Sequence, residues 1–284
     1  MKRIKQVPIL IFIILITIIT VSCANIVEDN VTTETISSSA QPSYSTSEPF
    51  ETEYSETEPM LFGENITFNY EYIDNGEVMP YGLFTPSSAN EKDSIPLIVW
   101  LHGGGERDCT PTWFSNISLP KAINEWTLEG FNAYVVCPHL NWEWNVGYWN
   151  NAVAAKYVMD LINQFTLEHN IDTKNIVIAG HSLGGQGAMY MAIRYPDYFS
   201  KGVVISSIHL DNGDINEIKI PMLGCIENSQ SRRHFLNTKF ADVFGEENVW
   251  HYDATHGNIP NVAFNQDKNE NNRSDLIEWM FDNN

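Results

Sequence analysis

The sequence is poor in basic residues, and this scarcity limits the partners that it can have. Among its 284 residues, 16 are Lys or Arg and 36 are Asp or Glu, which gives a formal net charge of −20. From residue 61 onward the net charge is −15, because 13 basic side chains are outnumbered by 28 acidic ones. A surface of this sign repels phosphate groups. We therefore expect a solvated acidic surface that binds neither nucleic acid nor anionic lipid headgroups.

Cysteine is also scarce, and so are the familiar ligand-binding motifs. Beyond Cys23 the chain holds Cys109, Cys137 and Cys225, an odd number that allows at most one internal disulfide. We expect three reduced, buried thiols, with a Cys109–Cys137 pair as the alternative. The sequence shows no metal-ligand cluster, no P-loop and no dinucleotide fingerprint. The expected chemistry therefore needs no metal and no cofactor.

The start of the chain lacks an apolar run of the ~20 residues that a spanning helix needs. Three basic residues among the first five precede an apolar stretch from Pro8 to Val21, a pattern typical of a targeting signal. Its end, Ile19-Thr20-Val21-Ser22-Cys23, resembles the lipobox of bacterial lipoproteins, which implies cleavage before Cys23 and a lipid on that cysteine. An ordinary cleaved signal and an uncleaved signal anchor are alternatives. All three place the rest of the chain outside the cytoplasm.

The next segment, from Ala24 to Met60, is rich in Ser, Thr, Glu and Pro and contains eight acids but no Lys or Arg. Such a composition buries too little apolar surface to offset its conformational entropy, so we expect a disordered tether. The chain then divides into a lipoprotein signal peptide (1–22), a lipidated cysteine with its tether (23–60) and one folded domain (61–284), which is long enough for a sizeable core.

Strand and helix patterns alternate through the folded domain. Two alternating segments flank Asp74-Asn75-Gly76, which indicates an antiparallel hairpin at 66–73 and 78–85. Continuous apolar runs typical of buried strands follow at 95–101, 133–137, 176–179, 203–206 and 222–226, and a last short strand is expected at 249–252. Helices are expected at 150–169, 183–195 and 274–281. This order predicts an α/β fold with a mainly parallel, doubly wound sheet, whose ligands bind beyond the carboxyl ends of the strands.

One strand, turn and helix start contains the segment Gly180-His181-Ser182-Leu183-Gly184. The turn is so tight that a side chain at either flanking glycine would collide with the backbone, and it pushes the serine into the open at a helix N-terminus. Negative charge is favoured there by the helix dipole and its free N–H groups. Ser182 is therefore expected to be the nucleophile of a serine hydrolase.

A glycine-rich loop, His102-Gly103-Gly104-Gly105-Glu106-Arg107, follows the buried strand at 95–101. Attack by serine on an acyl carbon creates an oxyanion, which preorganised backbone N–H groups must meet. We expect one donor from Leu183, directly after the nucleophile, and the other from Gly104, with Gly105 as its alternative. The place of this loop in the order of strands agrees with such a role.

A general base is expected in the loop after the last strand, where His256 stands beside Gly257 and Asn258. Its orienting carboxylate should follow the strand that ends near residue 226, and Glu227 is the acid at that point. Asp211 is the next candidate, and Asp253, Asp242 or no acid at all are further alternatives.

With these motifs the chain resembles the α/β-hydrolase superfamily from about residue 66 to residue 284. The segment from Trp100 to Arg107 looks like the branch of predicted peptidases and carboxylesterases that includes feruloyl-esterase-like and polyhydroxybutyrate-depolymerase-like enzymes. The resemblance implies roles for Ser182, His256 and the two N–H donors. It leaves the acid open, because family members usually have Asp after Gly where this chain has Glu227.

Aromatic residues follow two of the expected strands near the site, and rings of this kind suit a sugar, a phenolic acid or an acyl chain. The candidates for contact with substrate are Trp113, Trp142, Trp144 and Trp149. The alternative is that these rings pack the helix at 150–169 onto the sheet. No long helical insertion separates the strands at 203–206 and 222–226, so we expect no large cap domain and an open cleft.

Together these patterns predict an extracytoplasmic serine carboxylic-ester hydrolase that works through an acyl-enzyme, acts on small or carbohydrate-linked esters, and touches the membrane only through its lipid. A serine peptidase built on the same residues is the rival enzyme. A catalytically inactive module that binds glycans through its aromatic rings is the rival outside the enzymes. The sequence does not define the oligomeric state.

Overall fold

The computed structural model describes residues 60–62, 66–72, 78–90, 93–107, 119, 132–140, 148–211, 213–228, 235–265 and 275–282. The expected signal peptide, Cys23 and nearly all of the tether lie outside the described residues. So do Asp108, Cys109, Ser274 and the turn between the first two predicted strands.

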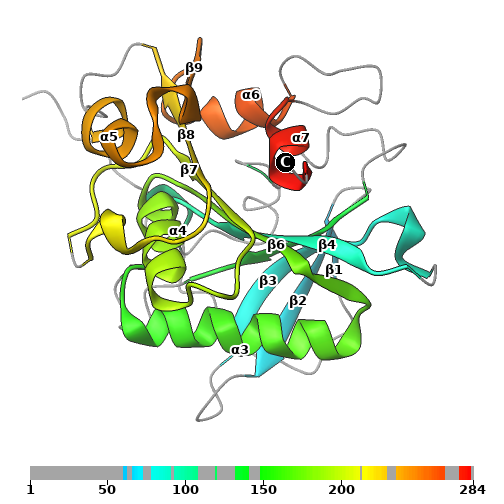
Figure 1. Ribbon diagram of the computed structural model, residues 1–284. Helices are drawn as coiled ribbons and strands as arrows, with labels where there is room; N and C mark the ends of the chain where they lie inside the picture. The colour runs from blue at the N-terminus through cyan, green and yellow to red at the C-terminus, as the bar shows by residue number, and fades with distance from the viewer. Residues whose placement is uncertain are drawn as a thin grey trace, which may run out of the picture. The chain divides into compact units, whose positions relative to one another are not determined.

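Among the described residues, nine strands form one sheet in the order β1-β2-β3-β5-β4-β6-β7-β8-β9 (Figure 1). The strands are β1 (Met60–Phe62), β2 (Ile66–Tyr72), β3 (Val78–Phe84), β4 (Ile95–Leu101), β5 (Tyr134–Pro138), β6 (Ile171–His181), β7 (Lys201–Ile205), β8 (Met222–Glu227) and β9 (Val249–Tyr252). The six strands from β5 to β9 in this order pair in parallel. The predicted α/β fold with a mainly parallel, doubly wound sheet is confirmed.

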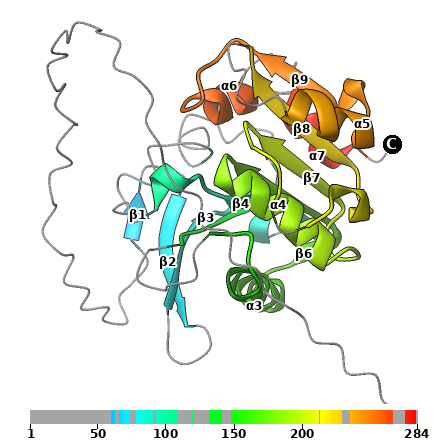
Figure 2. The ribbon, with the colours of Figure 1, turned by 90° about the vertical axis from the view of Figure 1, so that its left-hand side faces the viewer.

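An antiparallel portion closes one edge of the sheet, as the hairpin signal predicted. β2 pairs with β3 from Ile66↔Phe84 to Tyr72↔Val78, and β1 adds to the outer side of β2. β3 pairs antiparallel with β5 and so joins the hairpin to the parallel strands. Figure 2 shows this portion at one end of the sheet and β8 and β9 at the other.

Helices cover both faces of the sheet, because alternate residues of each buried strand point to opposite sides. Leu97, Val99 and Leu101 of β4 pack with α3 and α4, whereas Ile98 and Trp100 pack with α6 and α7. A π-helical turn η6 and helix α5 cover β7 and β8 on the α4 side. The helices are α3 (Ala152–Glu168), α4 (Leu183–Arg194), η6 (Leu236–Phe240), α5 (Ala241–Phe244), α6 (Ile259–Asn265) and α7 (Asp275–Phe281).

Local sequence explains where the longest helix begins. The side chain of Asn151 accepts hydrogen bonds from the backbone N–H groups of Val153 and Ala154, each at 2.9 Å, and so caps the first turn of α3. Apolar residues then recur at helical spacing and bury one stripe of the helix, from Ala154 to Phe165, against the sheet.

Several elements differ from the sequence-based expectation. β1 was not predicted, and β6 begins at Ile171 rather than at residue 176, because its first part is polar and only its second half is an apolar run buried on both faces. α7 is the closing helix that the sequence predicted, whereas η6, α5 and α6 were not predicted. The segment between β7 and β8 contains only the short 3-10 helix η4 (Ile215–Glu217) among its described residues.

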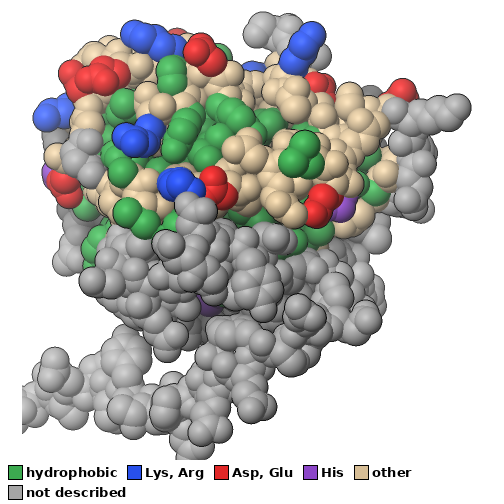
Figure 3. Space-filling view, turned by 90° about the horizontal axis from the view of Figure 1, so that it is seen from below, with side chains coloured by type: hydrophobic (Ala, Val, Ile, Leu, Met, Phe, Trp, Pro, Cys, Tyr) green, Lys and Arg blue, Asp and Glu red, His purple; other side chains and the backbone are tan. Residues whose placement is uncertain are grey.

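Figure 3 shows the lower face of Figure 1, where α3 lies, with apolar side chains between isolated acidic and basic ones. Leu167 of α3 is 87% exposed. Across the described ranges, every helix is too short or too polar to cross a bilayer.

Candidate active site

Ser182 occupies the sharp turn between β6 and α4. Its φ of 54° and ψ of −113° fall in the left-handed half of the backbone map, which a residue other than glycine seldom adopts. Its N–H donates to the Ile205 carbonyl oxygen at 2.8 Å, and its own carbonyl accepts from the Ser207 hydroxyl at 2.8 Å. These two bonds from the end of β7 hold the turn in its strained form.

The glycines on each side of Ser182 have no room for a side chain. A Cβ at Gly180 would lie 2.2 Å from the Gly184 carbonyl oxygen, and a Cβ at Gly184 would lie 1.9 Å from the Leu101 carbonyl oxygen. Both neighbours are backbone atoms, which cannot move aside as a flexible side chain can. The tight turn therefore requires glycine at position 180, and the close approach of α4 to β4 requires glycine at position 184.

The glycine-rich loop after β4 lies directly against the residue that follows the nucleophile. A Cβ at Gly104 would stand 2.5 Å from Cδ1 of Leu183. Gly105, the alternative donor, is exposed and would have nothing within 4 Å of a Cβ. Gly104 and Leu183, the two expected oxyanion donors, are thus neighbours in space.

Buried polar groups fix this loop. The Gly103 N–H donates to the carboxylate of Glu106, and the carbonyl of Glu106 lies 3.1 Å from Nε2 of His139. His102 is fully buried, and burial, followed by the nearby His139, lowers its pKa to about 3. The neutral ring accepts the Leu140 N–H at Nε2 (3.0 Å), so its proton is on Nδ1, 2.7 Å from the Gly103 carbonyl oxygen. The side chains of Glu106, His139 and His102 thus hold the backbone of the loop through hydrogen bonds.

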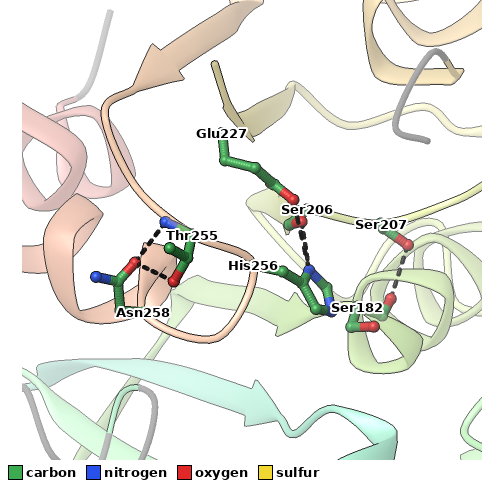
Figure 4. A network of polar contacts seen from close by, with 7 residues as sticks. All are labelled: Ser182, Ser206, Ser207, Glu227, Thr255, His256 and Asn258. Atoms are coloured by element: carbon green, nitrogen blue, oxygen red, sulfur yellow. Dashed lines mark hydrogen bonds and ion pairs between the residues drawn. The ribbon is translucent and has the colours of Figure 1, made fainter. Parts of the chain in front are cut away.

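His256 follows β9 in a short turn closed by its neighbours. The Asn258 side-chain oxygen accepts from the Thr255 N–H at 2.7 Å and from the Thr255 hydroxyl at 2.9 Å. The imidazole packs against His181, with ring centroids 4.6 Å apart and ring planes inclined by 41°, and its side chain is 38% exposed. In Figure 4 the edge of the ring opposite Nδ1 faces Ser182. The structure thus brings the expected base and the expected nucleophile to one point at the carboxyl ends of the strands.

Glu227, the last residue of β8, lies behind His256. Its side chain is completely buried, and its Oε1 is 3.6 Å from Nδ1 of His256. Within the described ranges its carboxylate accepts no hydrogen bond. Ser206, which the sequence did not point to, is closer to the same nitrogen, with its Oγ at 2.7 Å (Figure 4). In the sequence, only its position directly after β7 could have indicated a role for Ser206.

The other candidate acids lie elsewhere. Asp211 pairs with a different histidine, His209, at 2.8 Å, and both side chains are more than half exposed. Asp242 is exposed on α5, and Asp253 is exposed after β9. Glu227 is therefore the candidate that the structure brings to His256.

The four tryptophans divide into two groups. Trp113, Trp142 and Trp144 lie outside the described residues. Trp149 is 2% exposed, and its indole N–H donates to the His102 carbonyl oxygen at 2.9 Å. Its ring is therefore packed between the glycine-rich loop and α4, which corrects our expectation that it contacts substrate and agrees with the packing alternative.

Cys137 and Cys225 are buried free thiols. Burial raises the pKa of Cys225 to about 12, and burial together with Glu106 raises the pKa of Cys137 well above its ordinary value. Cys137 therefore forms no disulfide here, and Cys109 lies outside the described residues. In the part of the chain that the structure describes, His, Cys, Asp and Glu side chains form no group able to hold a metal ion.

The strand order, the strained serine turn and the facing histidine define an α/β-hydrolase. The sequence model of the Esterase family, described as "Putative esterase", matches residues 76–239, more than half of the chain. The chain belongs to this family.

Known relatives agree with this assignment. Feruloyl esterase B of Thermothelomyces thermophilus is 26% identical over 149 residues, which are 49% of this chain and 47% of that protein. The chain thus matches about half the length of this curated relative. A thermostable esterase of known structure has a TM-score of 0.58 at 22% identity, covering 76% of this chain and 62% of that one. A feruloyl esterase module of Clostridium thermocellum, solved with sinapinate, has a TM-score of 0.52 at 13% identity, covering 70% and 89%. Both structures share the fold.

Proposed function

We propose that this protein is an ester hydrolase that works through a serine nucleophile, with Ser182 attacking, His256 as general base and Glu227 as the carboxylate behind it. One observation carries the proposal. Ser182 is held in a strained turn at the start of α4, and it faces an imidazole whose Nδ1 edge points toward a buried carboxylate (Figure 4).

The reaction runs in two halves. Oγ of Ser182 attacks the ester carbonyl carbon while its proton passes to Nε2 of His256. The tetrahedral intermediate then expels the alcohol, which takes the proton from His256, and an acyl-enzyme remains. Water then attacks the acyl carbon and gives a proton to His256; as the bond from that carbon to Oγ breaks, His256 returns the proton to Oγ of Ser182 and the carboxylic acid leaves. The buried charge of Glu227 stabilises the imidazolium in both halves.

The oxyanion of each intermediate needs donors that are already in place. The proximity of Gly104 to Leu183 supports a hole formed by the N–H groups of these two residues. The hydrogen bond from Gly103 to Glu106 holds the loop in place before substrate arrives. The N-terminus of α4, a helix of 12 residues, adds its dipole at the same point.

As substrates we propose acyl or feruloyl esters of carbohydrate. The similarity to a feruloyl esterase over half of the chain supports this class. Trp113, Trp142 and Trp144 are the proposed ring contacts, because they follow strands that end at the site. A panel of p-nitrophenyl acetate, methyl ferulate, acetylated and feruloylated sugars and short peptide amides tests the class. Turnover of amides with no turnover of esters would replace the esterase with the rival peptidase.

We also propose that the enzyme acts outside the cytoplasm, held to the membrane by a lipid on Cys23 and by no other contact. The signal-like start and the acidic composition that follows support this location. The full chain should partition into the detergent phase of Triton X-114, and the Cys23→Ala variant should stay in the aqueous phase. Equal partitioning of the two would refute the lipid anchor.

The nucleophile is tested by Ser182→Ala. We expect kcat on p-nitrophenyl acetate to fall at least about 1000-fold, since the attacking oxygen is lost. A fluorophosphonate probe should label the wild type and leave the variant unlabelled. Unlabelled wild-type enzyme without ester turnover would favour the inactive glycan-binding module, and wild-type turnover by the variant would exclude Ser182 as nucleophile.

A further inference from the structure

Ser206 follows β7 and lies beside the proposed catalytic residues. Its side chain is fully buried, and its N–H donates to the Cys225 carbonyl oxygen at 2.7 Å. Its φ is 48°. Ser182 and Ser206 are the two residues other than glycine with positive φ in the described ranges, and both lie next to His256.

The hydroxyl of Ser206, and not the carboxylate of Glu227, is the hydrogen-bond partner of the imidazole. Nδ1 of His256 is 2.7 Å from Oγ of Ser206, which is an ordinary hydrogen-bond length. The same nitrogen is 3.6 Å from Oε1 of Glu227, which is too long for one. Figure 4 shows the carboxylate end of Glu227 next to Ser206.

We propose that Ser206 is a positioning residue of the reaction, whose hydroxyl accepts the Nδ1–H of His256 and holds the ring beside Glu227. This inference rests on the proposed function of Ser182 and His256. The hydroxyl oxygen has two lone pairs, so it can accept the Nδ1–H while the carboxylate of Glu227 stays 3.6 Å from the same nitrogen.

The hydrogen bond between Ser206 and His256 fixes the tautomer of the general base. With Nδ1–H bound to the hydroxyl, the lone pair of the ring is on Nε2, where the proton of Ser182 must arrive. When Nε2 takes that proton, the positive charge of the ring is met by the hydroxyl oxygen of Ser206 and by the nearby carboxylate of Glu227. Ser206 gives up no proton in this step, and no bond to its Oγ is broken.

The backbone of Ser206 agrees with a functional role. A left-handed conformation costs a residue with a side chain of order 1–3 kcal/mol, and such strain gathers at active sites. Glycine would adopt this φ without strain. Ser206 has a side chain in spite of this strain, and that side chain places its hydroxyl beside His256.

Two variants separate the hydroxyl from the backbone. Ser206→Ala and Ser206→Gly both remove the hydroxyl, but only glycine relieves the strain at φ 48°. We expect kcat to fall about 10-fold to 100-fold in both, the loss that follows removal of one hydrogen bond to a charged group. KM should stay within about twofold because Ser206 does not touch substrate.

The pH dependence and the proton spectrum give readouts that a merely structural role would not move. Loss of an acceptor for Nδ1–H disfavours the imidazolium, so the acid limb of the kcat/KM profile should move to lower pH in both variants. The downfield proton resonance of Nδ1–H in the free enzyme should shift or vanish. Ser200→Ala is the matched control, because Ser200 precedes the same strand and donates to the Ile176 carbonyl oxygen at 3.1 Å.

Three outcomes decide the inference. Loss of activity in both variants, with a shifted resonance and an unchanged Ser200→Ala enzyme, supports it. Full activity in Ser206→Gly with loss only in Ser206→Ala overturns it, since the position would then act through its backbone. Unchanged kcat and resonance in both variants also overturn it, while an active wild type that labels at Ser182 leaves the proposed function standing.

Discussion

The site has two halves that are built in different ways. The elbow half, which comprises the turn at Ser182 and the loop 102–107, is held by backbone contacts and by side chains that bond to backbone. The relay half comprises Ser206, Glu227 and His256, whose contacts run from side chain to side chain across three strand ends. The elbow half therefore depends on how closely backbone segments pack, whereas the relay half depends on the chemical groups of its side chains.

The comparison teaches that substitutions should act differently in the two halves. In the elbow half, extra atoms collide with backbone and the fold itself should suffer. In the relay half, an isosteric change leaves the packing intact but alters charge or hydrogen bonding, so chemistry should suffer while stability is largely kept. Three experiments test this division, in order of decreasing effect.

The largest effect is expected in the relay half from Glu227→Gln. The amide has the shape of the carboxylate but no charge to stabilise the imidazolium, so kcat should fall about 10³-fold to 10⁴-fold. Steady-state turnover of p-nitrophenyl acetate measures the loss, and thermal unfolding reports stability, which we expect to change little. Asp211→Asn is the matched control, because Asp211 pairs with the exposed His209. Equal losses of kcat in both variants would show that Glu227 has no specific role beside His256.

The next effect is expected in the elbow half from Gly184→Ala. The new methyl group would lie 1.9 Å from the Leu101 carbonyl oxygen, so α4 and β4 must move apart. We expect the free energy of unfolding to fall by about 3 kcal/mol or more, above the usual range for an overpacked core. Urea unfolding measures it. Gly105→Ala, where a Cβ meets nothing within 4 Å, should change stability by less than about 0.5 kcal/mol. Similar stability of the two variants would contradict the steric account.

The elbow half was the more predictable from sequence, for the same physical reason. A tight turn requires glycines at set positions, and a buried strand before it requires an apolar run, so residues 176–184 by themselves predicted the strained turn that carries the proposed nucleophile. The hairpin and the parallel strands were predicted equally well, because period and run length depend on nearby residues.

The relay half was less predictable because its geometry depends on contacts between distant residues. Ser206 lies 50 positions from His256 in the chain, and a serine after a strand is common. Glu227 was one of several acids until the structure placed β8 beside β9. Trp149 carried the same sequence signal whether it packs or binds, and only its 2% exposure decided between them.

The smallest effect concerns His102, which supports the elbow half as a neutral ring. Burial first, and then the nearby His139 and Arg107, lower its pKa to about 3, against an ordinary value of 6.5. Between these values the unfolded chain binds a proton that the folded chain does not, so this residue costs stability as the pH falls from about 6.5 toward 3. The slope due to one such group is at most about 1.4 kcal/mol per pH unit.

Replacing His102 with Asn removes this titration and keeps a polar side chain beside Leu140 and Gly103. The Asn variant should be less stable at pH 7, and its stability should fall less steeply than that of the wild type between about pH 6 and pH 4. Urea unfolding at several pH values measures how the free energy of unfolding of each protein depends on pH. Carboxylates that titrate in the same range contribute equally to both slopes, so the difference between the slopes reports on His102 alone. Parallel slopes for wild type and His102→Asn would mean that the ring takes up its proton in the folded state, and the loop could not then depend on a neutral acceptor at Nε2.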